Sequence, residues 1–376
     1  MNSNGFVTSA ALPSIKLWQK LSQRRRPLGF DLEITARCNN DCRHCYINLP
    51  AGDVEARRTE LSLGEIEDIA GQAVSLGAFW CLISGGEPLL RQDFSEIYLA
   101  LRKKGLLVSV FTNACLVKEE HVRLFQKYPP RDLEVTVYGV TEETYERVTR
   151  RSGSYAAFRN GLDLLLKSGL KVRLKAMALR SNVHELPEIT EFCRAHTSDY
   201  FRFDPLLHLR YDRDPQRNQE IMNERLSPEE IVRIEQADEK RSGALEKNCN
   251  SFILPEHDGE ICDHLFHCGA GTGNFSVSYD GIFRLCADLW QEDCTFDLRK
   301  GSLEQAWNEL VPVVREQRST NPVFLERCRR CSIINLCLWC PAHAHLESGD
   351  MDGWIDYFCQ VAHARAKAIQ DRVQSA

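Results

Sequence analysis

The sequence lacks several features that would place it in whole classes of protein. No apolar run reaches the roughly 20 residues that a membrane-spanning helix needs. Residues 1–27 contain neither a continuous apolar core nor a small-residue cleavage site, so no export signal is predicted. Basic residues are outnumbered, 47 Lys and Arg against 53 Asp and Glu, which argues against general nucleic-acid binding. We therefore expect a cytoplasmic protein with no membrane and no nucleic acid among its partners.

Cysteine, in contrast, is abundant, with 16 residues in a chain of 376. In a cytoplasmic protein of this length, metal or redox roles are expected of cysteines rather than disulfides. The length allows one large domain and a smaller one. The spacing of the cysteines must therefore indicate what they do.

Short apolar runs alternate with amphipathic stretches from residue 30 to about residue 235. Ser62 with Glu65, and Ser227 with Glu230, form capping boxes that mark two helix starts. Six strand–helix units predict an α/β fold with a parallel sheet covered by helices, closed partly into a barrel or open and doubly wound. The strands are expected at 30–35, 78–84, 106–112, 132–139, 171–179 and 200–207, and the helical stretches at 61–77, 93–105, 118–128, 141–169, 185–196 and 227–240.

Three cysteines, Cys38, Cys42 and Cys45, crowd the loop after the first strand. Parallel α/β folds place their active sites at this end of the strands. A tetrahedral zinc site requires four ligands, and His44 is the candidate fourth ligand in that interpretation. In a 4Fe-4S cluster, three thiolates leave one iron free to bind a small molecule by its amine and carboxylate.

A glycine turn, "ISGGEPLLR", ends the second strand, with Gly85, Gly86 and Glu87 in it. Two glycines let a backbone approach a ligand closely, and Glu87 can accept a hydrogen bond from an ammonium group. Asn113 ends the third strand in the same way, within "FTNA". A plain structural turn is the alternative for both segments.

Together, "CNNDCRHCY" and the following "SGGEP" resemble the radical S-adenosylmethionine (radical SAM) superfamily, over residues 30 to about 235. The resemblance implies a partial (β/α)6 TIM-like barrel, in which Cys38, Cys42 and Cys45 hold a 4Fe-4S cluster that binds S-adenosylmethionine. It implies that Gly85, Gly86 and Glu87 bind the methionine amine, that the backbone beside Tyr46 meets the adenine, and that Asn113 lies near the ribose or methionyl part. Thr136 and Lys175, on the fourth and fifth strands, are expected at the same mouth or in the barrel packing.

Nine of the 16 cysteines lie between Cys262 and Cys359. Their series, with a glycine-rich hairpin that turns at Tyr279-Asp280-Gly281, resembles the SPASM domain of peptide-modifying radical SAM enzymes; two zinc sites are the alternative. The resemblance implies two auxiliary 4Fe-4S clusters, and hence three in all. The first would be ligated by Cys262, Cys268, Cys286 and Cys340, and the second by Cys328, Cys331, Cys337 and Cys359. Only Leu338 and Trp339 separate Cys337 from Cys340, where the family usually has three residues.

The remaining chemical candidates are fewer. Asp288, two residues after Cys286, is a candidate catalytic base by resemblance to sulfatase-maturing enzymes, with a solvated turn as the alternative. Asp204, His208, Arg210 and Asp212 are candidates for substrate contact. Cys81 and Cys193 are expected to pack in the core, and no role is assigned to Cys115, Cys249 or Cys294.

These observations predict three segments: a lead-in over residues 1–27, a radical SAM partial barrel over 28–241, and a SPASM domain with a C-terminal helix over 242–376. The resemblance implies a radical SAM oxidoreductase of the peptide-maturase type, which forms thioether or carbon–carbon cross-links in a ribosomally made peptide or protein. The alternatives are a formylglycine-forming sulfatase maturase, a tetrapyrrole-tailoring enzyme, and a structural iron–sulfur or zinc module. The expected partners are the peptide substrate, a separate leader-peptide-recognition protein, and a flavodoxin- or ferredoxin-type electron donor.

Overall fold

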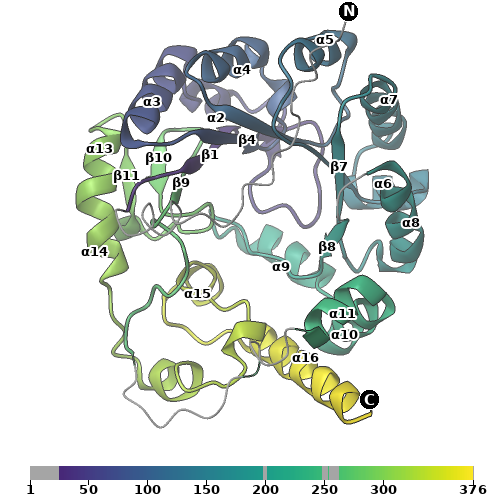
Figure 1. The fold of residues 1–376 in the computed structure, drawn as a ribbon, viewed down its shortest axis with the longest axis vertical. Coiled ribbons are helices and arrows are strands. Elements are labelled where there is room, and N and C mark those ends of the chain that lie inside the picture. Colours follow the sequence, from purple (N-terminus) through teal and green to yellow (C-terminus); the bar gives the residue numbers. More distant parts are fainter. Residues whose placement is uncertain (1–24, 198–200, 248–252, 254–261, 376) are drawn as a thin grey trace, which may run out of the picture.

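A nine-stranded sheet forms the centre of the molecule, and helices cover its outer face (Figure 1). The computed structural model describes residues 25–197, 201–247, 253 and 262–375. All six predicted strands are present, parallel and in chain order, so the predicted α/β partial barrel is confirmed. They are β1 (Gly29–Thr35), β4 (Trp80–Gly85), β5 (Leu107–Thr112), β6 (Leu133–Val137), β7 (Val172–Met177) and β8 (Arg202–Asp204).

The helices of the barrel begin where the sequence predicted starts. Ser62 and Ser227 each close a capping box, with Glu65 and Glu230, at the N-termini of α3 and α10. A short pair, β2 (Arg37–Cys38) and β3 (Leu49–Pro50), frames the cysteine loop. The helices are α2 (Val54–Thr59), α3 (Leu63–Leu76), α4 (Phe94–Lys103), α5 (Glu119–Lys127), α6 (Glu142–Thr149), α7 (Ser154–Lys167), α8 (Leu186–His196), α9 (Pro215–Glu224), α10 (Pro228–Ala237) and α11 (Glu239–Lys247).

The stretch predicted to be helical over 141–169 is divided into α6 and α7. Arg150 and Gly153 both take positive φ angles, 53° and 77°, between the two helices. A left-handed residue ends a helix, because it turns the next amide away from the helical ladder. The predicted division at 241/242 stays a prediction, and α11 spans it.

Strands from the C-terminal region extend the barrel sheet. Strand β9 (Asn274–Val277) pairs in parallel with β1, and β10 (Ile282–Arg284) and β11 (Thr295–Asp297) continue outward. Phe30 and Phe275 stack across the join, with ring centroids 5.2 Å apart. The hairpin turns where the sequence predicted, with φ 89° at Gly281. The two regions therefore share one sheet.

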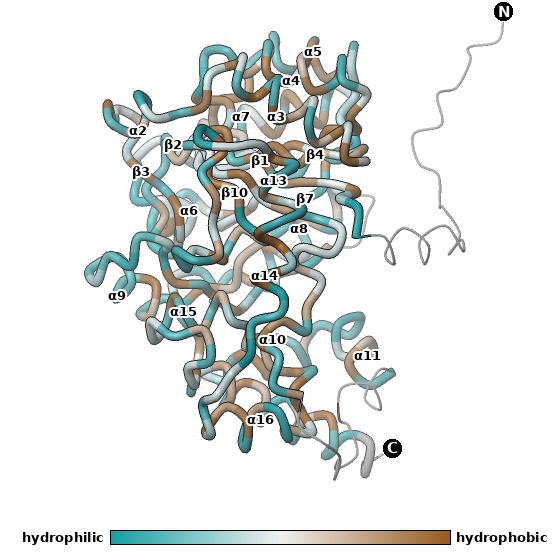
Figure 2. The backbone as a smooth tube through the Cα atoms, turned by 90° about the vertical axis from the view of Figure 1, so that its left-hand side faces the viewer, coloured by the Kyte–Doolittle hydropathy of each residue, from teal (hydrophilic) through white to brown (hydrophobic). Residues whose placement is uncertain are grey.

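The rest of the C-terminal region lies against the last barrel helices. Figure 2 shows α10, α11 and α16 together at the end of the molecule opposite α3 and α4. Glu235 of α10 binds Arg365 of α16 at 2.6 Å, with both side chains largely buried. No helix in the described part of the chain is long and apolar enough to cross a membrane. The elements are α13 (Leu303–Gln305), a π-helical turn (Ala306–Leu310), α14 (Val311–Arg315), α15 (Pro341–Ser348) and α16 (Asp356–Ser375), the last confirming the predicted C-terminal helix.

Candidate functional site

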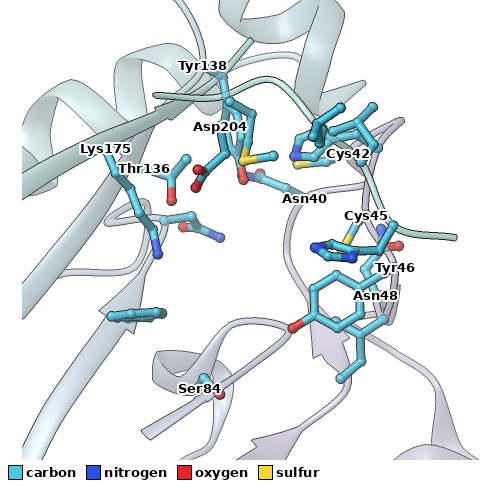
Figure 3. Close-up of a pocket in the computed structure, with 18 of the residues that line it drawn as sticks. Asn40, Cys42, Cys45, Tyr46, Asn48, Ser84, Thr136, Tyr138, Lys175 and Asp204 are labelled. Atoms are coloured by element: carbon cyan, nitrogen blue, oxygen red, sulfur yellow. The ribbon is translucent and has the colours of Figure 1, made fainter. Parts of the chain in front are cut away.

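A cavity of about 600 Å³ lies at the carboxyl ends of the barrel strands. Figure 3 shows Lys175, Thr136 and Asp204 on one side of it, with Cys42, Cys45 and Tyr46 on the other. The structure thus brings together residues that are far apart in the chain. Of the predicted site residues, those that line this cavity are Cys38, Cys42, Cys45, Tyr46, Gly85, Gly86, Asn113, Thr136 and Lys175.

Arginines from distant segments fix the cysteine loop. The guanidinium of Arg210 donates to the carbonyls of Cys45 and Asn48, both at 3.3 Å. Arg217, on α9, donates to the carbonyl of Cys42 at 3.3 Å. The sequence offered Arg210 only as a substrate contact, but it is 3 % exposed and supports the loop from behind. Loops of irregular backbone need such donors to satisfy their buried carbonyls.

The three thiols of the loop suit a cluster better than a single ion. Tetrahedral zinc, with Zn–S bonds of about 2.3 Å, holds its ligand sulfurs about 3.8 Å apart. Within the described residues, no set of three that includes these cysteines or His44 has its ligand atoms all within 4.8 Å of one another. A 4Fe-4S cube binds one thiolate at each corner iron and spreads its ligands further apart.

The charge of the thiols in the loop depends on a cationic partner. Burial raises the pKa of Cys38, Cys42 and Cys45 above the ordinary thiol value. Thiolates therefore form here only against positive charge, as bound iron supplies. The backbone amide of Asn40 and the side-chain amide of Asn113 donate to Cys38 Sγ at 3.4 and 3.7 Å, and donors of this kind tune cluster potentials.

The glycine turn lies directly on the backbone that leads into the cysteine loop. Gly86 N donates to Thr35 O at 2.7 Å, and Glu87 N donates to Arg37 O at 2.9 Å. A Cβ on Gly85 would lie 2.1 Å from Thr35 O, and one on Gly86 would lie 2.3 Å from Arg37 O. Only glycine permits this approach, and both glycines line the cavity.

The carboxylate of Glu87 points into the protein. It accepts from the Thr112 hydroxyl at 2.8 Å and from the amides of Leu89 and Asn113 at 3.0 and 2.7 Å. Glu87 is fully buried and is not among the residues that line the cavity. Burial raises its pKa to about 7. Glu87 thus fastens the glycine turn to the end of β5, a role that the motif alone did not indicate.

Lys175 provides a cation on the wall opposite the cysteines. Its Nζ lies 3.3 Å from Glu134 Oε2 and 3.5 Å from the centre of the Phe111 ring. Burial lowers its pKa, because the charged form is poorly solvated there. Thr136, on the neighbouring strand β6, pairs in register with Lys175. Both side chains face the cavity, as the predicted strand registers required.

Four C-terminal cysteines meet in a second cavity of about 610 Å³, namely Cys328, Cys331, Cys337 and Cys359. Burial, and then the charges of the other three thiols, raise the pKa of Cys337 to about 11. These are the four residues predicted for the second auxiliary cluster.

The other predicted set is grouped in part. Burial raises the pKa of Cys286 to about 12, and the charges of Cys340 and Cys268 contribute to the increase. Cys340 thus lies with this group despite the short Leu338–Trp339 spacing. Cys262 is exposed, and its Sγ lies 3.4 Å from His264 Nδ1. Cys249, which was given no role, lies outside the described residues.

Asp288 does not line the main cavity. It lies behind two histidines that do, His208 and His343, and its Oδ2 is 3.6 Å from His343 Nε2. Although burial opposes ionisation, these histidines lower the pKa of Asp288. No feature of the sequence pointed to His343, because its neighbours come from other segments. Asp204 and His208, proposed for substrate contact, both face the cavity.

The unassigned cysteines lie in packed surroundings. Cys81 and Cys193 belong to the hydrophobic core, as expected. Cys294 is buried, and its Sγ lies 3.8 Å from Met351 Sδ. Cys115 lies near the cysteine loop, with its Sγ 3.8 Å from the side-chain amide of Asn40.

Similar proteins include a coproporphyrin synthase and a bacteriocin biosynthesis protein. The chain is 26 % identical over 356 residues to the Fe-coproporphyrin III synthase of Methanosarcina barkeri, covering 88 % of this chain and 86 % of that protein. It is 25 % identical over 321 residues to the antilisterial bacteriocin subtilosin biosynthesis protein AlbA of Bacillus subtilis, covering 84 % of this chain and 67 % of that protein. Proteins of two different biosynthetic processes are therefore similar to this chain at nearly the same identity.

The fold is shared with a solved structure. Streptococcus suis SuiB bound to its precursor peptide SuiA superposes with a TM-score of 0.66 at 17 % identity, covering 96 % of this chain and 84 % of that one. Residues 32–193 match the family profile of the radical SAM superfamily. That match contains the cysteine loop, the glycine turn and five of the six barrel strands around the cavity. Residues 32–193 therefore form a radical SAM domain.

Proposed function

We propose that this chain modifies a peptide or protein side chain oxidatively, forming a thioether or carbon–carbon cross-link. The observation that carries this is the cavity, where the cysteine loop, the glycine turn and residues of the C-terminal region form one lining. The likeness in fold to SuiB, whose structure holds a precursor peptide, supports a peptide as the substrate. The similarity to AlbA, a bacteriocin biosynthesis protein, agrees with it.

The residues of the cavity have separate tasks in this proposal. When bound, the cluster and S-adenosylmethionine supply the one-electron cleavage that yields a 5'-deoxyadenosyl radical for hydrogen abstraction. Cys38, Cys42 and Cys45 would hold the cluster, and the backbone of Gly85 and Gly86 would bind the methionyl end. Glu87 holds that turn in place through its three hydrogen bonds.

The remaining contacts to the cofactor follow from where the side chains lie. The Tyr46 backbone would meet the adenine, and Asn113 would contact the ribose or methionyl part. Thr136 and Lys175 line the opposite wall, where a cation suits a carboxylate. Barrel walls on several sides keep water from the reacting atoms.

Oxidative cross-linking also requires an acceptor for a second electron. Joining two groups with loss of two hydrogen atoms leaves one proton and one electron beyond the abstracted hydrogen. We assign auxiliary 4Fe-4S clusters to the two C-terminal sets, Cys262, Cys268, Cys286 and Cys340, and Cys328, Cys331, Cys337 and Cys359. Iron–sulfur sites so placed fit the role of electron acceptors. A flavodoxin- or ferredoxin-type donor and a separate leader-recognition protein complete the proposed system.

The first test of the function is formation of 5'-deoxyadenosine. The anaerobically reconstituted and reduced full-length protein should produce it from S-adenosylmethionine, measured by chromatography with mass spectrometry. Cys42→Ala should abolish the product, and Cys294→Ala, a buried cysteine away from the proposed clusters, should retain it. If the reconstituted wild-type protein makes no 5'-deoxyadenosine, the proposed function is wrong.

The second test concerns the substrate. Precursor peptides encoded beside the gene should lose the mass of one hydrogen molecule per cross-link when incubated with the active enzyme. A tetrapyrrole is the second candidate, because the Fe-coproporphyrin III synthase aligns with 88 % of this chain. Turnover of an iron porphyrin, or oxidation of a sulfatase peptide to formylglycine, with no change in the precursor peptides would overturn the cross-linking proposal.

A further inference from the structure

Three side chains from three separate segments meet at the seam between the barrel and the C-terminal region. His208 follows β8, Asp288 follows β10, and His343 lies in the first turn of α15. Each offers one ligand atom, and these atoms all lie within 4.8 Å of one another. Among the described residues, this is the one group of at least three His, Cys, Asp or Glu that meets this spacing.

The hydrogen bond from His343 Nδ1 to the Leu338 carbonyl turns the other ring nitrogen, Nε2, toward Asp288. His343 Nδ1 lies 2.9 Å from the Leu338 carbonyl, which can only accept, so Nδ1 carries a hydrogen. His343 Nε2 is buried without a hydrogen-bond partner and faces Asp288 Oδ2 at 3.6 Å. Metal-binding histidines show this arrangement, in which a backbone carbonyl orients the ring through its other nitrogen.

His208 adds a second ring of the same kind. Its Nδ1 is also buried without a partner, and its ring centre lies 4.3 Å from that of His343 at a tilt of 49°. The carboxylate of Asp288 beside the two imidazoles favours a positive charge at this point, either a proton on His343, which then forms an ion pair with Asp288, or a metal ion. The guanidinium of Arg284 is already engaged by Glu33 at 2.6 Å and by the Trp290 ring.

We propose that His208, Asp288 and His343 bind one divalent transition-metal ion of the zinc or iron(II) type. Two imidazoles and one carboxylate, with no thiolate, form the ligand set that such ions accept in sites with open positions. Both histidines line the main cavity, so the open positions face the space where the substrate enters. A thiolate or carboxylate of the substrate then completes the coordination.

Zinc is the probe for this site, because it can be measured separately from the iron of the clusters. The fully reconstituted protein is incubated anaerobically with zinc, freed of excess by gel filtration, and analysed by plasma mass spectrometry and zinc-edge X-ray absorption. We expect one zinc per chain with nitrogen and oxygen neighbours at about 2.0–2.1 Å and no sulfur at about 2.3 Å. Zinc in a cysteine site would show the sulfur distance.

Two ligand variants and one matched control test the assignment. His208→Ala and His343→Gln should weaken zinc binding by at least about tenfold while keeping wild-type iron and sulfide contents. His196→Ala, at an exposed position on α8, should bind zinc as the wild type does. Absence of zinc from the wild-type holoenzyme, a sulfur-dominated spectrum, or unchanged affinity in His208→Ala would each overturn the proposal. The site does not depend on the proposed function, since zinc retention and 5'-deoxyadenosine formation are measured separately.

Discussion

Replacing Gly86 by alanine should damage both the stability and the chemistry of this protein. Its φ is outside the left-handed region, so alanine can adopt the backbone and only the collision matters. The new Cβ would lie 2.3 Å from Arg37 O and 2.6 Å from Ala36 O, whereas ordinary contacts begin at 3.4 Å. The chain that leads into Cys38 must therefore retreat by about 1 Å.

The loss of stability in Gly86→Ala can be estimated from the contacts that this displacement of the backbone disturbs. Overpacking of this kind typically costs about 1–3 kcal/mol. Both carbonyls also accept hydrogen bonds, Ala36 O from Leu49 N at 2.8 Å and Arg37 O from Glu87 N at 2.9 Å. Weakening these two bonds adds about 1 kcal/mol each, for a total of about 3–5 kcal/mol. A displacement of about 1 Å beside the cysteine loop can also slow catalysis about 100-fold.

Alanine variants of two other glycines serve as controls. They separate the effect of the steric collision from the other effects of adding a methyl group. Gly64 has open space around it and no positive φ, so Gly64→Ala should leave the denaturation midpoint unchanged or slightly raised. Gly105 has open space but a φ of 86°, so Gly105→Ala should report backbone strain alone, about 1–2 kcal/mol. The assays are urea denaturation of the reconstituted proteins and the rate of 5'-deoxyadenosine formation. If Gly86→Ala matches Gly64→Ala in both assays, the close packing of the turn on the cysteine loop is wrong.

Three further predictions test other parts of the molecule. The reconstituted wild-type protein should hold about twelve iron atoms per chain. Cys359→Ala should lose about four of them and Cys294→Ala none. Equal iron contents in all three proteins would contradict the assignment of Cys359 to an auxiliary cluster. Glu87→Ala leaves three buried donors without their acceptor, which should cost about 1–3 kcal/mol in urea denaturation, and Glu87→Gln should recover part of it; no loss in either would refute the fastening role. Glu235→Ala removes the ion-pair partner of two arginines and should lower the free energy of unfolding by about 3–5 kcal/mol. Arg58→Ala breaks an exposed ion pair and should leave the urea denaturation midpoint unchanged. Equal midpoints for the two variants would show that burial of the Glu235 ion pairs does not contribute to stability.

The sequence predicted those structural features that a few consecutive residues determine. Strand and helix periodicity predicted the six parallel strands, because each is decided by a few consecutive residues. The capping box at Ser62 and the hairpin turn at Gly281 are likewise short-range features. The cysteine loop is also a short-range feature, because its three thiols lie close together in the sequence after β1.

Other features depend on segments that the chain brings together only in three dimensions. Strand β9 pairs with β1 across more than half of the chain, and its four residues carry no signal for that neighbour. Glu33 alternates with the apolar residues Leu32 and Ile34 in β1, yet it is 1 % exposed and pairs with Arg284 of β10. Arg210 and His343 are further cases, because their partners lie in distant loops. Patterns in one segment cannot encode these contacts.

The shared sheet changes what the C-terminal region does for the active site. A boundary at 241/242 would make the barrel a unit of its own, but the outer edge of β1 is covered by β9. Without that partner, the edge would expose unpaired backbone groups beside the buried side chains of Phe30 and Leu32. Leu338, His343 and Arg365 also line the main cavity, together with the barrel strands. The C-terminal region therefore completes both the sheet and the wall of the main cavity, and the barrel alone lacks part of that wall.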